Sequence, residues 1–198
     1  MSDSAPPPQR GRPRRPGTRE AVIQAFVTLV GEQGYAATSM DEVAERAGVS
    51  KATIYRRWPS RDALIVDVHR AMVDESDARD TGSLEGDLLA LLERIAGMLE
   101  QTAFARLVVA SAGEMLANPE LATVFRERVL GPRLELIGTV FARAIERGEV
   151  EPDVDWRSWA YTLIGTNIFR VAFMGEGPDR EANRELVRAI VRQARGDV

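Results

Sequence analysis

The sequence predicts an all-α protein of about nine helices, with a short N-terminal helical domain followed by a longer one. Apolar residues recur at helical spacing along most of the chain, beginning with Val22, Phe26, Leu29 and Val30. Glycines, prolines and serines stand where such helices would begin and end, and no stretch alternates as a strand would. At 198 residues the chain is long enough to bury a core of its own.

The N-terminal third predicts four helices in close succession, beginning at Thr18, Ser39, Ser50 and Ser60. The first ends at Gly34, and the second starts with a capping box formed by Ser39 and Glu42. Gly48 supplies the turn between the second and third helices. The third ends near Trp58, before Pro59, and the fourth runs to about residue 79.

Five further helices are expected, at residues 84–101, 104–117, 119–147, 155–174 and 180–195. Gly131-Pro132 interrupts the third of these, either as a kink or as a split into two helices. Residues 80–83 and 175–178, rich in polar residues and glycine, mark two of the loops.

Composition excludes several classes of function. The chain has no cysteine, so disulfides, thiol nucleophiles and thiolate metal sites are excluded. His69 is the single histidine, and we expect it to be a packed or exposed helix residue rather than a sensor. Without a nucleophile–base set, paired carboxylates or a phosphate loop, we expect no enzyme, no metal and no cofactor. Apolar runs are too short to span a membrane and no signal peptide is evident, so a cytoplasmic location is predicted.

Charge is unevenly distributed along the chain. Residues 1–66 hold ten basic and seven acidic residues, a balance of +3, whereas the whole chain carries −4. A positive end on a negative body favours contact with a polyanion at that end.

Residues 1–16 are rich in proline, serine and arginine and predict a disordered basic arm. The arm contains Arg10-Gly11-Arg12-Pro13, which resembles the core of an AT-hook. Three interpretations remain open: Arg10 and Arg12 enter a narrow A·T-rich minor groove, they contact phosphates without sequence preference, or they have no role.

A short basic helix after a glycine turn is suited to the major groove of DNA. At about 100° per residue, Ala52, Tyr55 and Arg56 share one face of this helix, and Ile54 and Trp58 share another that would pack inward. Lys51 in the first turn can donate to guanine, and Ala52 can touch a thymine methyl. Phosphate contacts are expected from side chains and from free amides at the starts of helices. The predicted DNA contacts are Arg10, Arg12, Thr38, Ser39, Ser50, Lys51, Ala52, Thr53, Tyr55, Arg56, Arg57 and Arg61.

Residues 18–66 resemble the N-terminal domain of the TetR family of transcriptional repressors. The resemblance rests on the residues 34–35, 38–44, 47–55 and 58–64. This chain has Trp58 where the family usually has Phe, Arg61 where it has Lys, and Arg57 where His or Tyr is common. The resemblance implies a DNA-binding domain at residues 17–62 and a ligand-binding and dimerisation domain at residues 63–198. It also implies a homodimer that binds a near-palindromic double-stranded operator and is released by a small-molecule effector.

Residues 155–174 are apolar on most sides and should be buried on most sides. Pairing with the same helix of a second subunit would achieve this, and Gly165 would permit close approach. Residues Leu186, Val187, Ile190 and Val191 would contribute to the same bundle. For a partly apolar effector, the candidate lining residues are Met98, Phe104, Leu107, Val108, Met115, Phe125, Phe141, Asn167, Phe169 and Arg170. The alternative for these apolar residues is an ordinary core, and for the polar ones a surface or intersubunit pair.

Two rival functions remain: an enzyme that uses the helix-turn-helix only as a scaffold, and an architectural DNA protein dominated by its basic arm. The sequence leaves open the effector, the operator, the number of dimers on it, and whether the chain represses or activates.

Overall fold

The computed structural model describes residues 17–71 and 79–196, in which helices are joined by loops and no strand is present. The helices are α1 (Thr18–Gln33), α2 (Met40–Arg46), α3 (Lys51–Arg57), α4 (Arg61–Ala71), α5 (Leu84–Leu99), α6 (Thr102–Ala117), α7 (Pro119–Phe125), α8 (Gly131–Glu146), α9 (Trp156–Phe169) and α10 (Arg180–Ala194). Two π-helical turns, η2 (Arg126–Leu130) and η3 (Arg170–Met174), follow α7 and α9 directly. Within these ranges the segments therefore join into nine continuous helices, and the predicted all-α class is confirmed.

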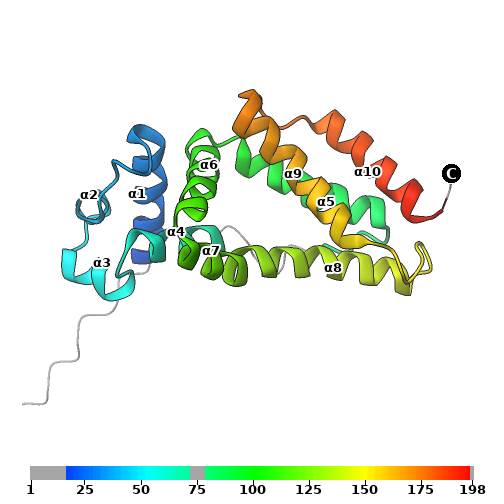
Figure 1. Cartoon of the computed structure of the whole chain (residues 1–198), viewed down its shortest axis with the longest axis horizontal. Helices are drawn as coiled ribbons and strands as arrows, with labels where there is room; N and C mark the ends of the chain where they lie inside the picture. Colours follow the sequence, from blue (N-terminus) through cyan, green and yellow to red (C-terminus); the bar gives the residue numbers. More distant parts are fainter. Residues whose placement is uncertain (1–16, 72–78, 197–198) are drawn as a thin grey trace, which may run out of the picture.

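The helices fall into two groups along the long axis of the molecule. Helices α1, α2 and α3 form one end, and α5, α8, α9 and α10 form the other, with α6 beside α1 (Figure 1). The predicted arm at residues 1–16, and the predicted part of the fourth helix at residues 72–78, lie outside the described residues.

The first of two hydrophobic clusters holds the N-terminal helices together. Val22 and Phe26 of α1, Val43 of α2 and Ile54 of α3 are each fully buried in it. The same cluster continues into α6, α7 and η2, through residues such as Leu107. The N-terminal core is therefore continuous with helices beyond residue 63.

Helices α1 and α6 approach each other closely at Gly31. A Cβ atom added at Gly31 would lie 2.6 Å from the Cβ of Ala103, which is inside van der Waals contact. Arg106 of α6 also donates a hydrogen bond to the carbonyl oxygen of Gly31. The absence of a side chain at Gly31 thus sets the distance between the two groups of helices.

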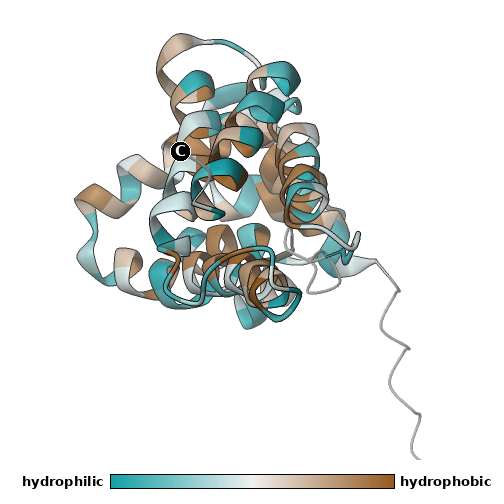
Figure 2. Ribbon diagram, turned by 90° about the vertical axis from the view of Figure 1, so that its right-hand side faces the viewer, coloured by the Kyte–Doolittle hydropathy of each residue, from teal (hydrophilic) through white to brown (hydrophobic). Residues whose placement is uncertain are grey.

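The second cluster holds the other end together. Leu88 and Leu92 of α5, Phe141 of α8 and Leu163 of α9 are buried in it, as are Val187, Ile190 and Val191 of α10. Brown and teal segments alternate within single helices, as expected for helices that bury one side (Figure 2). Three of the four α10 residues expected in an intersubunit bundle are therefore buried within one chain, and Leu186 is partly buried against the same cluster.

The predicted helix boundaries are close to those observed, with one informative difference. Residues 119–146 are a continuous helical rod, so Gly131-Pro132 neither splits nor ends the helix. The π-helical turn at Arg126–Leu130 directly precedes Gly131 and Pro132, and Pro132 lies in the first turn of α8. Proline lacks an amide hydrogen, and the change from π to α geometry occurs where that hydrogen would be needed.

Candidate nucleic-acid interface and internal cavity

The helix-turn-helix is fixed by caps at both of its helices. Ser39 and Glu42 form the predicted capping box of α2, with the Glu42 amide donating to Ser39 Oγ at 3.2 Å. Ser50 Oγ accepts from the Thr53 amide at 3.2 Å and caps α3. Gly48 between them has φ 66°, a left-handed conformation that favours glycine. These local interactions set the angle at which α3 leaves the turn.

Helix α3 has the two faces that its sequence predicts. Ile54 is fully buried and Trp58 is 3% exposed. The Trp58 indole nitrogen donates to Asp67 Oδ2 at 3.0 Å. On the other face Ala52 and Arg56 are exposed, and Tyr55 is 46% exposed. The buried side thus holds the helix rigidly while its opposite face is presented to solvent.

Asp67 joins α3 and α4 to α1. Its Oδ1 lies 2.8 Å from Nη2 of Arg19. Burial favours the neutral carboxyl, but the hydrogen bonds from Arg19 and Trp58 outweigh it and lower the pKa of Asp67. The carboxylate therefore stays charged near neutral pH and, through Trp58, holds the C-terminal end of α3 in place.

Lys51 begins α3 and is exposed at its first turn. Its ammonium lies 2.5 Å from Asp41 Oδ2 of α2. The hydrogen bond to Asp41 raises the pKa of Lys51. Because both groups are exposed, solvent screens this pair and a DNA phosphate or guanine can compete for the ammonium.

Arg56 and Arg57 are exposed near the end of α3. The guanidinium of Arg57 lies over the Trp58 ring, 5.0 Å from its centroid. Within the described ranges neither arginine makes an ion pair with a carboxylate, so the positive charge of α3 is available to a polyanion.

Three of the predicted phosphate anchors have other bonds in this structure. Thr38 is buried, and its hydroxyl donates to the Gly34 carbonyl at 2.8 Å. Arg61 Nη1 donates to the carbonyl oxygens of Tyr35, Ala36 and Thr38, which tightens the loop before α2. The Ser39 hydroxyl donates to Glu42 Oε2 at 2.7 Å.

The expectation of free amides at the helix starts was wrong for three positions. The Ser39 amide donates to Glu42 Oε2 at 2.9 Å. The amides of Glu42 and Thr53 donate to the capping serines. Serine and glutamate caps satisfy the very donors that a phosphate would use. Arg10 and Arg12 lie outside the described residues.

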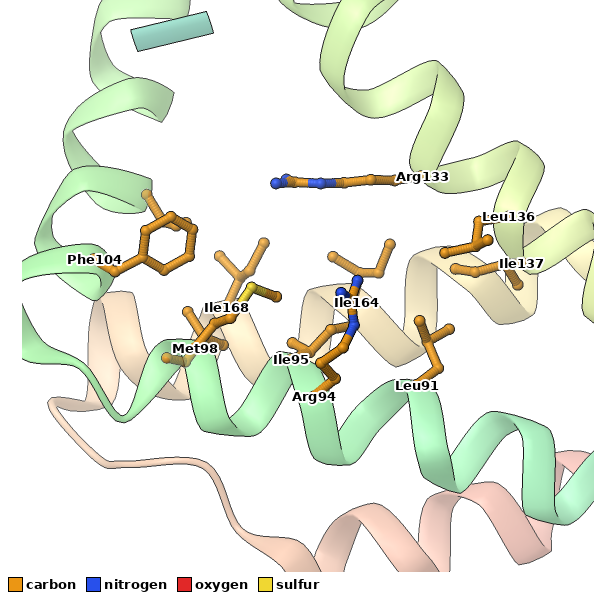
Figure 3. A pocket seen from close by; sticks show the side chains of 12 residues that line it. Leu91, Arg94, Ile95, Met98, Phe104, Arg133, Leu136, Ile137, Ile164 and Ile168 are labelled. Atoms are coloured by element: carbon orange, nitrogen blue, oxygen red, sulfur yellow. The ribbon is translucent and has the colours of Figure 1, made fainter. Parts of the chain in front are cut away.

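A cavity of about 80 Å³ lies between α5, α6, α8 and α9. Met98, Phe104 and Val108 line it, as the sequence predicts. The remaining lining residues are Leu91, Arg94, Ile95, Leu99, Arg133, Leu136, Ile137, Ile164 and Ile168. Arg133 extends across the cavity from α8, and Arg94 rises toward it from α5 (Figure 3).

The other predicted ligand residues lie elsewhere. Leu107, Met115 and Phe125 belong to the first hydrophobic cluster, and Phe141 to the second. Phe169 is 56% exposed on α9, outside the cavity lining.

The two polar candidates have partners within the chain. Asn167 is buried, and its Nδ2 donates to Asn183 Oδ1 at 3.0 Å, while its Oδ1 accepts a hydrogen bond from Asn183 Nδ2 at 3.2 Å. Arg170 lies 2.8 Å from Glu176 Oε2. Asn167 thus joins α9 to α10, and Arg170 joins α9 to the following loop.

Sequence reasoning missed Arg94 and Arg133. Arg94 lies in the apolar run Leu-Leu-Ala-Leu-Leu-Glu-Arg-Ile-Ala. An arginine beside so many buried positions is a signal in the sequence that could have indicated a partly buried charge. Arg133 directly follows Gly131-Pro132, and nothing in its neighbours distinguishes it from a surface residue.

Other kinds of site are not found in the described ranges. No group of three or more His, Asp or Glu side chains there is arranged to hold a metal ion. In the same ranges, no helix is long and apolar enough to cross a membrane.

Comparison with known proteins agrees with this geometry. Residues 22–68 match the family model for bacterial regulatory proteins of the tetR family. Residues 78–190 match the model for the tetracyclin repressor-like C-terminal domain. The two matches cover the helix-turn-helix and the helices that enclose the cavity.

Individual relatives are transcriptional regulators rather than enzymes, in agreement with the prediction. The HTH-type transcriptional regulator YdeS of Bacillus subtilis is 32% identical over 190 residues, covering 94% of this chain and 92% of the relative. The DNA-binding transcriptional repressor TetR of Mycobacteroides abscessus is 36% identical over 145 residues, covering 70% of this chain and 74% of the relative.

Among solved structures, the TetR family transcription regulator SCO0332 superposes with a TM-score of 0.70 at 30% identity. That similarity covers 92% of this chain and 98% of SCO0332. The chain therefore belongs to the TetR family of DNA-binding transcriptional regulators.

Proposed function

We propose that this regulator is a ligand-responsive, homodimeric repressor. It binds a near-palindromic operator through α3 and leaves it when a small molecule occupies the cavity. Residues 17–62 act as the DNA-binding domain and residues 63–198 as the ligand-binding and dimerisation domain, in the cytoplasm.

One observation carries the proposal most directly: α3 presents Lys51, Ala52, Tyr55 and Arg56 on its exposed side while its other side is locked into the core. A rigid helix with donors in its first turn and arginines at its end meets the needs of major-groove binding. We retain six residues on or beside this helix as phosphate contacts or as supports for such contacts: Thr38, Ser39, Ser50, Thr53, Arg57 and Arg61.

Dimerisation is supported by an apolar face on α9 and η3. Tyr161, Phe169 and Phe173 are 59%, 56% and 76% exposed and recur every four or eight residues. Gly165 lies between them and has open space beside it. A contiguous exposed aromatic face of this kind is costly in water unless a second surface covers it. Two copies of the same face form a two-fold dimer.

The dimer accounts for the shape of the operator. Two α3 helices related by a two-fold axis would enter successive major grooves ~34–36 Å apart. A ligand that changes this spacing lowers the affinity for DNA, provided that it binds the non-matching conformation more tightly.

Substitution of α3 tests the proposal. A tight site is first selected from random-sequence DNA with the unaltered protein. Its affinity is then measured by fluorescence anisotropy for the wild type, for Lys51→Ala and for Arg192→Ala, an exposed arginine on α10. We expect Lys51→Ala to weaken binding about tenfold or more, since a good base contact contributes about 1–3 kcal/mol. Equal affinities for the two variants would contradict the assignment of α3.

The basic arm requires a separate experiment. In the repressor proposal, deletion of residues 1–16 lowers affinity for all DNA but leaves the operator preference intact. Loss of most binding on deletion would favour the architectural alternative. Retention of full affinity would remove any role for Arg10 and Arg12.

A further inference from the structure

We infer that the cavity between α5, α6, α8 and α9 binds an organic anion with an apolar body, such as a carboxylic acid, with its acidic group bonded to Arg133 and Arg94. This inference rests on the proposed ligand response and names the chemical class of the effector.

The lining of the cavity has two distinct parts. Apart from Arg94 and Arg133, its ten lining residues have aliphatic, aromatic or methionine side chains, from Leu91 to Ile168. The two arginines supply the polar part, and within the described ranges no carboxylate lines the cavity. A ligand matched to this lining has a hydrocarbon body and an acceptor at one end.

The positive charges of Arg94 and Arg133 repel each other in the cavity. Burial, and the positive charge of Arg94 beside it, lower the pKa of Arg133 to about 10. An anion placed between them would relieve this repulsion and form charge-assisted hydrogen bonds to planar guanidinium groups, which suit carboxylates. A neutral ligand of the same shape would form no charge-assisted hydrogen bond to either guanidinium.

Arg133 also links the cavity to the DNA-binding end. Its Nη2 donates to the carbonyl oxygen of His69 in α4 at 3.1 Å. The His69 ring is buried between Phe104 and Phe125, with centroid distances of 5.7 and 4.9 Å. Phe104 in turn lines the cavity.

An anion that recruits the Arg133 guanidinium competes with the His69 carbonyl for the same donors. The position of α4, whose Asp67 accepts a hydrogen bond from Trp58 at the end of α3, then depends on whether the cavity is filled. Arg133 is therefore a positioning residue for α4 as well as a ligand-binding residue.

The size of the cavity restricts the apolar body. A volume of about 80 Å³ admits a short chain or small ring, and a longer chain requires lining side chains such as Met98 to move. Methionine is flexible and unbranched, so the end of the cavity that it lines is the easier one to extend.

Direct binding to the full-length protein without DNA tests the inference. Butanoate, hexanoate, octanoate and decanoate are titrated by calorimetry, each beside the primary amide of the same chain length as its neutral match. Inorganic phosphate serves as the anion without an apolar body. We expect at least one acid to bind, and to bind about tenfold to a hundredfold tighter than its amide. Failure of every acid to bind overturns the inference without any variant, and so does equal affinity for an acid that binds and for its amide.

Variants assign the site. Arg133→Met and Arg94→Met keep the apolar volume of the side chain, and Arg192→Met on α10 is the matched surface control. We expect both cavity variants to lose about tenfold or more in acid affinity while amide affinity is retained or increased. Acid binding unchanged in both variants overturns the assignment. Where acid binding is lost, retained amide binding distinguishes the loss from misfolding.

Release from the selected operator is measured separately with the same acids. Binding of octanoate without release of DNA leaves the anion site standing and contradicts the proposed ligand response. Release of DNA by octanamide but not by octanoate leaves the ligand response standing and contradicts the anion site.

Discussion

At the scale of single residues, the pair between Lys51 and Asp41 controls the first turn of α3. The ammonium that would contact DNA lies 2.5 Å from a carboxylate of α2 in the free protein. Binding to DNA therefore exchanges one ionic partner for another, and the net gain is smaller than for a free lysine.

This pair gives the first prediction. Asp41→Asn removes the competing carboxylate, and we expect operator affinity at low salt to rise about two- to fivefold. Glu181→Gln, which removes the carboxylate that pairs with Arg184 on α10, changes the net charge equally and serves as the control. An affinity for Asp41→Asn no higher than that of Glu181→Gln, in the same anisotropy titration, would count against the role of Lys51.

His69 gives a second prediction at the residue scale. Its ring is buried, which lowers its pKa to about 3, with the nearby charge of Arg133 adding to the effect. Below the unfolded pKa of about 6.5 the unfolded chain takes up a proton that the folded chain does not, so stability is full above this pH and falls as the pH is lowered toward 3.

Because His69 is the single histidine, the window between pH 7 and pH 5 isolates it. We expect the wild type to lose about 2 kcal/mol of unfolding free energy across that window beyond the loss in His69→Gln. Glutamine preserves a donor for the Ser111 hydroxyl, which lies 2.9 Å from His69 Nε2. Urea titrations at fixed protein concentration measure both, and parallel pH profiles for the two proteins would show that His69 is not buried in solution.

At the scale of helices, the junction between α1 and α6 couples the two ends of the molecule. Gly31→Ala places a methyl group against Ala103, and we expect a loss of about 1–3 kcal/mol in unfolding free energy. Gly113→Ala, also within a helix but with open space beside it, is expected to be neutral or slightly stabilising. Similar stabilities for the two variants by thermal unfolding would mean that α1 and α6 are not in tight contact.

Sequence and structure agree best where the determinants are local. The capping box at Ser39, the glycine turn at Gly48 and the inward positions of Ile54 and Trp58 follow from a few neighbouring residues, and each is observed. The proposed function of α3 follows from the same short stretch, since a helix that binds DNA needs only one exposed face.

The ligand cavity could not be read in this way. Its lining comes from four helices, and only Met98, Phe104 and Val108 among the candidates reach it. Helical periodicity identifies inward positions but not the other helix that each position meets. Leu107 and Phe141 share the hydrophobicity of the lining yet fill two different cores. Arg61 shows the same limit, because its three carbonyl partners become neighbours only when the loop before α2 folds.

At the scale of the whole molecule, the proposed dimer rests on the exposed face of α9 and η3. Phe169 and Phe173 stack with their centroids 5.3 Å apart and are largely exposed in one chain. We expect Phe173→Glu to shift the protein from dimer to monomer, because it buries an unpaired charge in the interface. Leu116→Glu is the control, since Leu116 is 89% exposed on α6. Sedimentation velocity reports both, and a Phe173→Glu dimer as stable as the control would place the interface elsewhere.

The most direct test of the account is the binding of the purified protein to sheared DNA from its own source, with sequencing of the retained fragments. Moderate salt is needed, because binding to phosphates alone weakens with a log–log slope of about −0.9 per contact. The account predicts a few sharply enriched near-palindromes whose half-sites lie about one helical turn apart. Broad enrichment of A·T-rich DNA without a palindrome would contradict a sequence-reading dimer.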